Sequence, residues 1–125
     1  MDSTTSTLEE MLQAAFTPTE RAVLGLVDNL LEACPPTGLC LVWSDDRCRV
    51  SDGIDRNSIV FEAVIRRSVF RAALARIAKL CNETKPNSVS PYGGDGEIST
   101  NSGAAFAASF VNTPAEQRLE LSRIS

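Results

Sequence analysis

The sequence predicts a single small α+β domain that comprises all of residues 1–125. Two segments repeat apolar residues at helical spacing, and two others surround turn residues with strand-forming ones. With 43% apolar residues, the chain also has enough apolar surface for one modest core. Together these observations predict helices near both termini, with β-hairpins and further helical segments between them.

Three helices are predicted by capping boxes, in which a Glu follows a Thr by three residues. The Thr oxygen and the Glu carboxylate then accept bonds from backbone N–H groups that the first turn leaves unpaired. The predicted helices span about 8–15, 18–33 and 114–122. Pro35 and Pro36 end the second helix. The first is too short to be stable alone, so its apolar edge must pack on the domain or on a second chain.

Two segments are predicted to form β-hairpins. In 39–50, strand-forming residues lead to Ser44-Asp45-Asp46, and polar and apolar residues alternate after this turn. In 86–111, turn signals rich in Gly, Pro and Asn separate short stretches, which predicts one long hairpin or a pair. The Asp residues of the first hairpin and of the loop after it lack the spacing of an EF-hand. We therefore expect turns there and no metal site.

The most informative segment is Ile59 to Leu80, IVFEAVIRRSVFRAALARIAKL. It is predicted to form a short helix, a tight turn and a longer helix with an apolar stripe facing the core. Between Arg56 and Lys85, seven basic and two acidic residues give a charge of +5. The other 95 residues hold five basic and fourteen acidic side chains, a charge of −9. Such a concentration of positive charge indicates an anionic partner, with nucleic acid as the first candidate.

The same segment resembles the helix-turn-helix of winged-helix bacterial transcription regulators. Its nearest resemblance is to the C-terminal domain of CodY-type repressors, in Ile65-Arg66-Arg67-Ser68-Val69 and in Ala73-Leu74. The resemblance implies a winged helix-turn-helix fold, with a helix-turn-helix core at about 57–81 and a wing at about 86–111. The hairpin at 39–50 is then an insertion, and the terminal helices are extensions.

The resemblance and the charge pattern together predict a DNA-binding regulatory protein without catalytic activity. Arg66, Arg67, Ser68 and Arg71 are expected to face the bases, and Arg56, Arg76, Lys79 and Lys85 are expected to hold phosphates of double-stranded DNA. Modules of this kind commonly work as two-fold dimers, so a homodimer is expected.

An alternative function stays open, in which the same basic helix binds an acidic protein surface. The chain is then a protein–protein interaction module, such as an adaptor, an antitoxin or a phage-type inhibitor. The wing region from Asn87 to Val111 contains no Lys or Arg, and the net charge of the chain is −4. Both observations favour a protein partner over DNA.

The composition argues against several other classes of function. The chain has no His, which excludes Ser-His and Cys-His catalysis and His-ligated metals. Cys34, Cys40, Cys48 and Cys81 form no C-x-x-C pair, so we expect buried, reduced thiols, with a Cys34–Cys40 or Cys40–Cys48 disulfide as the alternative. The N-terminus resembles no signal peptide, and no apolar run approaches the roughly 20 residues of a membrane span. We expect no cofactor and a cytoplasmic location.

Overall fold

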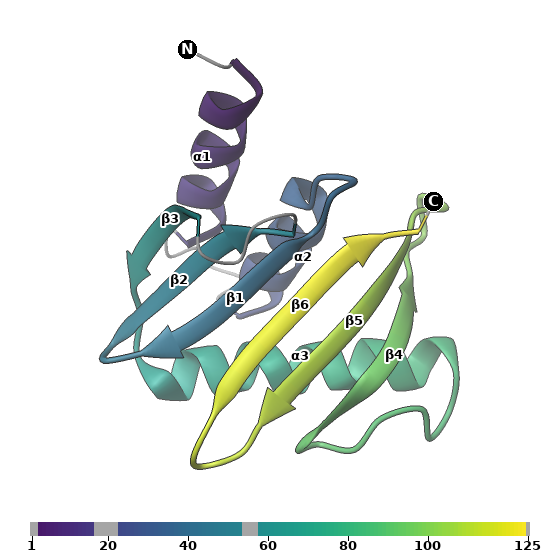
Figure 1. Ribbon diagram of the computed structural model, residues 1–125. Helices are drawn as coiled ribbons and strands as arrows, with labels where there is room; N and C mark the ends of the chain where they lie inside the picture. The colour runs from purple at the N-terminus through teal and green to yellow at the C-terminus, as the bar shows by residue number, and fades with distance from the viewer. Residues whose placement is uncertain (1–2, 17–22, 54–57, 125) are drawn as a thin grey trace.

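The computed structural model describes residues 3–16, 23–53 and 58–124, which form three helices and six strands (Figure 1). In chain order the elements are α1 (Ser3–Phe16), α2 (Val23–Ala33), β1 (Leu39–Ser44), β2 (Arg47–Asp52), β3 (Ile59–Val64), α3 (Arg67–Thr84), β4 (Gly93–Ser99), β5 (Ala105–Asn112) and β6 (Gln117–Arg123). The predicted α+β class is confirmed. The helices predicted at 8–15 and 18–33 correspond to α1 and α2. The capping box predicted to start the first helix at Thr7 is wrong, because α1 begins at Ser3, and the capping box of the second helix lies outside the described residues.

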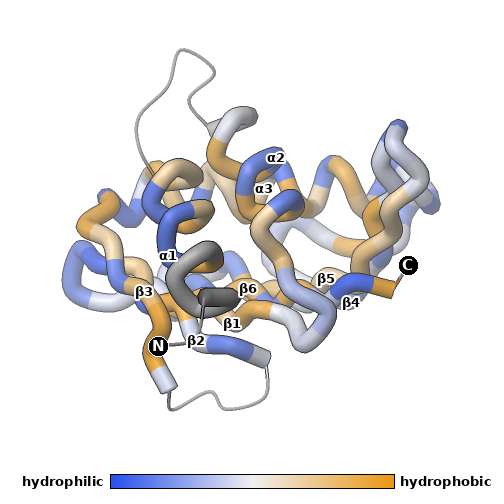
Figure 2. The backbone as a smooth tube through the Cα atoms, turned by 90° about the horizontal axis from the view of Figure 1, so that it is seen from above, coloured by the Kyte–Doolittle hydropathy of each residue, from blue (hydrophilic) through white to orange (hydrophobic). Residues whose placement is uncertain are grey.

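The six strands form one antiparallel sheet in the order β3-β2-β1-β6-β5-β4. Two three-stranded units meet where β1 pairs with β6, and α3 connects β3 at one edge to β4 at the other. The helices described all lie on one side of this sheet (Figures 1 and 2). α3 packs against β4, β5 and β6, while α2 contacts both α3 and α1. The opposite face of the sheet, here named the open face, is left uncovered by these helices.

The core lies between the helices and the covered face of the sheet. Strand residues alternate accordingly, so that Phe106 and Phe110 of β5 are buried while the residues next to them are half-buried. On the helix side, the apolar stripe predicted for the longer helix is confirmed, because Phe70, Leu74 and Ile77 of α3 are buried.

β1 and β2 form the hairpin predicted at 39–50, and its turn explains two of the Asp residues. Asp45 and Asp46 have φ angles of 53° and 61°, and they connect Ser44 to Arg47, which pair directly. A two-residue turn with two positive φ angles is of type I′, which matches the twist of the strands that it joins. Asp adopts this conformation more readily than most residues. The predicted turn role of Asp45 and Asp46 is therefore confirmed.

The short helix predicted at the start of the helix-turn-helix is wrong, because Ile59–Val64 forms the strand β3. Phe61 and Ala63 pair with Val50 and Cys48 of β2, so pairing with β2 decides the conformation. A six-residue segment with five apolar residues contains too little periodicity to separate a helix from a strand. Without this helix, the described residues 58–81 do not form two successive helices, and the structure does not confirm a winged helix-turn-helix fold.

The helix predicted at 114–122 is also wrong, since Gln117–Arg123 forms the strand β6. The Thr113 hydroxyl does accept hydrogen bonds from the backbone N–H groups of Ala115 and Glu116, at 3.3 and 3.1 Å. These bonds close the turn between β5 and β6 instead of starting a helix. After the turn, buried Leu119 and Leu121 alternate with half-buried and exposed residues, which is the period of a strand.

The hairpin predicted at 86–111 is confirmed as β4 and β5, with residues 100–103 at its turn. The Gly-rich stretch 93–96, a strong turn signal in the sequence, lies within β4 instead. Gly96 belongs to the covered face, where it pairs with the buried Ala108. Its lack of a side chain permits a close approach of α3, because an added Cβ would lie 2.9 Å from the Cβ of Cys81.

The four cysteines are all free and buried, which confirms the prediction of reduced thiols over either disulfide. Burial raises the pKa of the Cys34 thiol to about 11 and that of the Cys48 thiol to about 12. Because the thiolate is both the nucleophile and the metal ligand, these two thiols are held in their unreactive form at neutral pH.

Candidate interaction surface

α3 carries most of the predicted site residues, and its packing fixes where they lie. Its N-terminus has no side-chain cap and no acidic residue in its first turn. Arg66, Arg67 and Ser68 are exposed there, and we name these three residues the α3 corner. The helix dipole makes this end positive, so the two guanidinium groups add charge of the same sign. The α3 corner is therefore electropositive.

Within the α3 corner, the Arg67 guanidinium lies over the ring of Trp43. Its Cζ is 5.4 Å from the ring centroid, which is within the range of a cation–π interaction. The Trp43 indole N–H donates a hydrogen bond to the Ile65 carbonyl oxygen at 2.7 Å, and this bond fixes the ring. Arg67 Nη1 also lies 3.5 Å from the carbonyl oxygen of Pro114. The fold thus positions the guanidinium while the Arg67 side chain stays exposed.

Arg71, one turn further along α3, is bound within the fold. Its Nε donates to Oδ1 of Asn112 at 2.9 Å, and Nδ2 of Asn112 donates to the carbonyl oxygen of Arg71 at 3.3 Å. Asn112 is the last residue of β5 and is 6% exposed. This reciprocal pair fastens the first half of α3 to the sheet, so Arg71 has a structural partner where the sequence predicted a base contact.

We expect Asn112→Ala to lower the free energy of unfolding by about 1–3 kcal/mol, because it leaves the half-buried Arg71 Nε without its acceptor. Urea denaturation at neutral pH measures the loss. Asn101→Ala is the control, since Asn101 is exposed in the turn between β4 and β5 and its replacement should change the free energy by at most about 0.5 kcal/mol. Equal effects of the two substitutions would contradict the tethering role of Asn112.

The remaining predicted contact residues are spread along α3. Lys79 is exposed about three turns after the α3 corner, and Lys85 is exposed immediately after the helix ends. Arg76 is half-buried, and its Nε is buried without a hydrogen-bond partner in the described part of the chain. Arg56 lies outside the described residues. α3 has 18 residues and a length of about 27 Å, so the predicted residues do not converge on one point.

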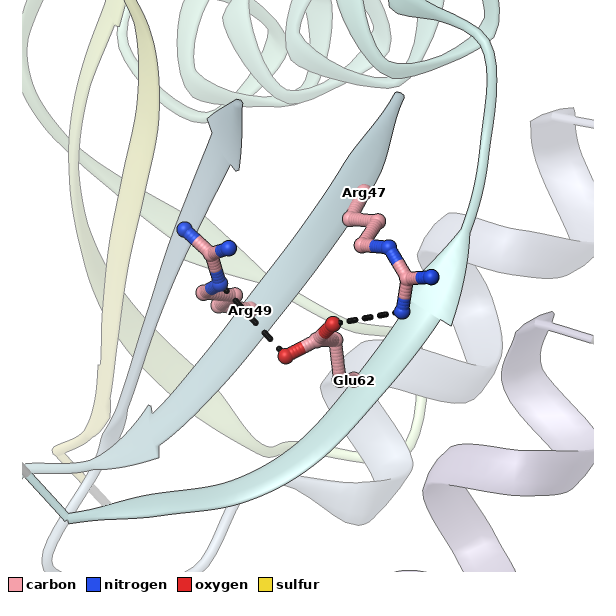
Figure 3. A network of polar contacts seen from close by, with 3 residues as sticks. All are labelled: Arg47, Arg49 and Glu62. Atoms are coloured by element: carbon pink, nitrogen blue, oxygen red, sulfur yellow. Dashed lines mark hydrogen bonds and ion pairs between the residues drawn. The ribbon is translucent and has the colours of Figure 1, made fainter. Parts of the chain in front are cut away.

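A second charged cluster, absent from the sequence-based prediction, lies on the open face at β2 and β3 (Figure 3). One carboxylate oxygen of Glu62 accepts a hydrogen bond from Arg47 Nη1 at 2.7 Å, and the other lies 3.4 Å from Arg49 Nε. In β2 these arginines alternate with buried Cys48 and Val50, and this alternation is a signal of the cluster. The short helix predicted from Ile59 onward conceals this signal, because a helix would remove Glu62 from the sheet.

The hydrogen bond from Arg47 is the main cause that holds the pKa of the Glu62 carboxyl below its ordinary value of 4.5, with a smaller effect from the charge of Arg49. The pair therefore stabilises the fold above pH 4.5, and this stabilisation is lost as the pH falls through the lower, folded-state pKa. We expect Arg47→Ala to raise the pKa of Glu62 more than Arg49→Ala does. Carbon-13 NMR titration of the Glu62 carboxyl group measures both shifts, and an unchanged pKa in Arg47→Ala would contradict the assignment.

No group of three or more His, Cys, Asp or Glu side chains in the described ranges is placed to hold a metal ion. No helix within these ranges is long and apolar enough to cross a membrane. Comparison of the chain with protein-family models, with curated proteins and with solved structures finds no significant match.

Proposed function

We propose that this chain is a non-catalytic protein-interaction module that binds a carboxylate-rich segment of a partner protein at the α3 corner. The observation that carries the proposal is the exposed Arg67 guanidinium held over Trp43, whose own ring is fixed by the Ile65 carbonyl oxygen. Arg66 lies beside Arg67 and is exposed too.

A guanidinium positioned in this way suits a carboxylate ligand. Its planar set of N–H donors matches the two oxygens of a carboxylate, and stacking on an aromatic ring leaves in-plane donors available. Because Trp43 already restricts Arg67, less side-chain entropy is lost on binding. Arg and Trp are also the residue types that contribute most often to the energy of protein–protein interfaces.

The distribution of charge favours a protein partner over DNA. Arg71 is engaged by Asn112, and Arg76 is half-buried, so α3 does not present a continuous row of exposed cations to successive phosphates. The neighbouring strand β4, which packs against α3, contains no Lys or Arg, so it adds no phosphate contact beside this helix.

Binding of a labelled acidic peptide tests the proposal. We expect a fluorescein-labelled peptide of alternating Asp, Glu and Leu to raise its anisotropy with the wild-type protein, and to bind at least about tenfold more weakly to Arg67→Ala, a loss of about 1.4 kcal/mol. Arg67→Lys should lose almost as much, since an ammonium group lacks the planar donors. Lys79→Ala is the control on the same helix and should bind like wild type. If Arg67→Ala also binds like wild type, the α3 corner is not the site.

DNA binding is the second candidate, and the exposure of Arg66, Ser68, Lys79 and Lys85 along one helix favours it. It requires no helix-turn-helix, because phosphate contacts depend on charge and reach alone. A fluorescent random-sequence duplex titrated at about 50 and 200 mM salt separates the two candidates. Binding that collapses at the higher salt and is lost in Lys79→Ala would support DNA, whereas no binding at either salt leaves the acidic protein partner.

A further inference from the structure

The covered face of the sheet changes from apolar to polar at the end where β6 finishes and the chain turns from β4 to β5 (Figure 1). In β6, Leu119 and Leu121 are buried against the core, and the next residue on the same side is Arg123. Arg123 pairs with Phe106 of β5, and its Cζ lies 6.0 Å from the centroid of the Phe106 ring. A charged residue at a core-facing position of a strand indicates a function at that position.

The two neighbouring strands also lack large apolar side chains on the covered face at this end. Ile98 is buried near the end of β4, and the next residue on the same side is the half-buried Thr100. Just before β5, the residue on the same side as Phe106 is the small Ala104. Small and polar side chains therefore leave space between this end of the sheet and α2.

A cavity of about 440 Å³ occupies this space, and small-molecule sites typically have volumes of about 300–1,000 Å³. One wall is the C-terminal half of α2, which contributes Asp28 and Glu32. The other wall is the turn between β4 and β5 together with Arg123. Glu32 and Arg123 are both exposed, so the cavity opens to solvent.

Hydrogen bonds within the fold hold the wall formed by the turn. The Thr100 N–H donates to the Ala104 carbonyl oxygen at 2.9 Å, and the Gly103 N–H donates to the Thr100 carbonyl oxygen at 3.0 Å. At the end of β6, the Ile124 N–H donates to the Ala105 carbonyl oxygen at 2.8 Å, which fixes the end of this strand beside the cavity. Because the wall is already ordered, a ligand loses little affinity to the ordering of the protein.

The two walls of the cavity carry opposite charges. Asp28 and Glu32 are four residues apart in α2, so they lie on the same side of the helix, and the negative end of the helix dipole adds to their charge. On the other wall, Arg123 supplies a guanidinium. Its charge partly offsets the increase that burial causes in the pKa of Cys34, which places the guanidinium near the end of α2. One ligand can therefore meet both a negative and a positive group.

We propose that this cavity binds a free α-amino acid. Its carboxylate binds the planar N–H donors of Arg123, and its ammonium group binds the carboxylates of Asp28 and Glu32. A guanidinium has five donors and a carboxylate accepts several hydrogen bonds, so these groups bind the ligand and keep their contacts within the fold. An anion alone would meet two carboxylates, and a cation alone would meet a guanidinium, so a ligand with both charges is the best match.

The cavity and the α3 corner are separate sites. Pro114, which contacts Arg67 of the α3 corner, precedes β6, whereas Arg123 ends this strand. The seven residues of β6 span about 20 Å. The amino-acid site therefore does not depend on the proposed function, and the experiments on the two sites succeed or fail independently.

NMR titration of the full chain with each of the common L-amino acids tests the proposal. We expect at least one of them to shift the backbone amide signals of Asn29 and Ser102, which line the cavity, with a dissociation constant of about 1 mM or lower. Arg123→Ala should raise this constant at least about tenfold. Arg118→Ala is the matched control, because Arg118 is on the same strand but belongs to the open face, and it should bind like wild type.

Far-UV circular dichroism verifies that both arginine variants are folded. The proposal is overturned if no amino acid shifts the cavity signals, or if the folded Arg123→Ala variant binds like wild type.

Two derivatives of the bound amino acid test its two charged contacts separately. The methyl ester lacks the carboxylate charge and the N-acetyl derivative lacks the ammonium charge, so each should bind at least about tenfold more weakly than the amino acid. Glu32→Gln should weaken binding of the amino acid but not of its N-acetyl derivative, because only the former carries the charge that Glu32 binds. A methyl ester that binds as well as the amino acid would identify a cation site, and an equally strong N-acetyl derivative would identify an anion site. Either result overturns the proposal.

Discussion

Replacing Phe70 with Ala is expected to lower the free energy of unfolding by about 3–5 kcal/mol, because the substitution removes a large apolar side chain and leaves a cavity. Phe70 lies in the first turn of α3, is 1% exposed and is among the largest fully buried side chains of the described residues. A domain of this size is stable by only about 5–15 kcal/mol. The variant should therefore unfold at a much lower urea concentration.

Denaturant titration followed by the fluorescence of Trp43, the one Trp of the chain, measures this loss. Val69→Ala is the matched control, because Val69 is the preceding residue of the same helical turn and is 37% exposed. We expect it to lower the free energy of unfolding by less than about 1 kcal/mol. Similar losses for the two variants would mean that α3 does not turn its Phe70 side toward the core.

α3 is the element that the sequence predicts best, and the reason is its length. Over 18 residues, apolar residues recur often enough to separate a helical period from that of a strand. This period also predicts which residues of α3 are buried. The β1–β2 hairpin was predictable for a local reason as well, since Asp45 and Asp46 occupy a two-residue turn that favours their conformation. In both cases, the residues of the element itself are sufficient to predict its conformation.

β3 and β6 were mispredicted because their conformation depends on partners distant in the sequence. Glu62 pairs with Arg49 of β2, and Leu119 pairs with Leu41 of β1 and Phe110 of β5. Nothing local to 59–64 or 114–122 specifies these pairings. The capping interaction of Thr113 forms as expected, yet the same hydrogen bonds also close a turn between strands, so the motif does not identify the element that follows it.

The candidate surface was predictable in part for the same reasons. The sequence near the start of α3 is enough to predict that Arg66, Arg67 and Ser68 lie together at the N-terminal end of this helix. The stacking of Arg67 on Trp43 joins residues 24 positions apart, and the bonding of Arg71 to Asn112 joins residues 41 apart. Only the order of strands in the sheet brings these pairs together. Charge counting along the sequence therefore locates the basic helix but does not separate its exposed cations from those bound within the fold.

Gly96→Val is expected to destabilise the fold by about 3 kcal/mol or more, and Gly96→Ala by about 1–3 kcal/mol, because both overpack the contact between β4 and α3. A Cβ at this position would lie 2.9 Å from Cβ and 3.0 Å from Sγ of Cys81, which is itself fully buried on α3. The backbone of α3 fixes the position of the Cys81 Cβ, so α3 would have to move away from the sheet.

Asp95→Val provides the matched control for this series, because Asp95 precedes Gly96 in β4 and is exposed on the opposite side of the strand. Val favours strands, so this change should alter the free energy of unfolding by at most about 0.5 kcal/mol. Urea denaturation of the three variants should therefore rank them Asp95→Val, Gly96→Ala and Gly96→Val in order of increasing loss. Equal losses at Asp95 and Gly96 would mean that α3 does not lie directly against β4, and the α3 corner would then be placed differently relative to the sheet.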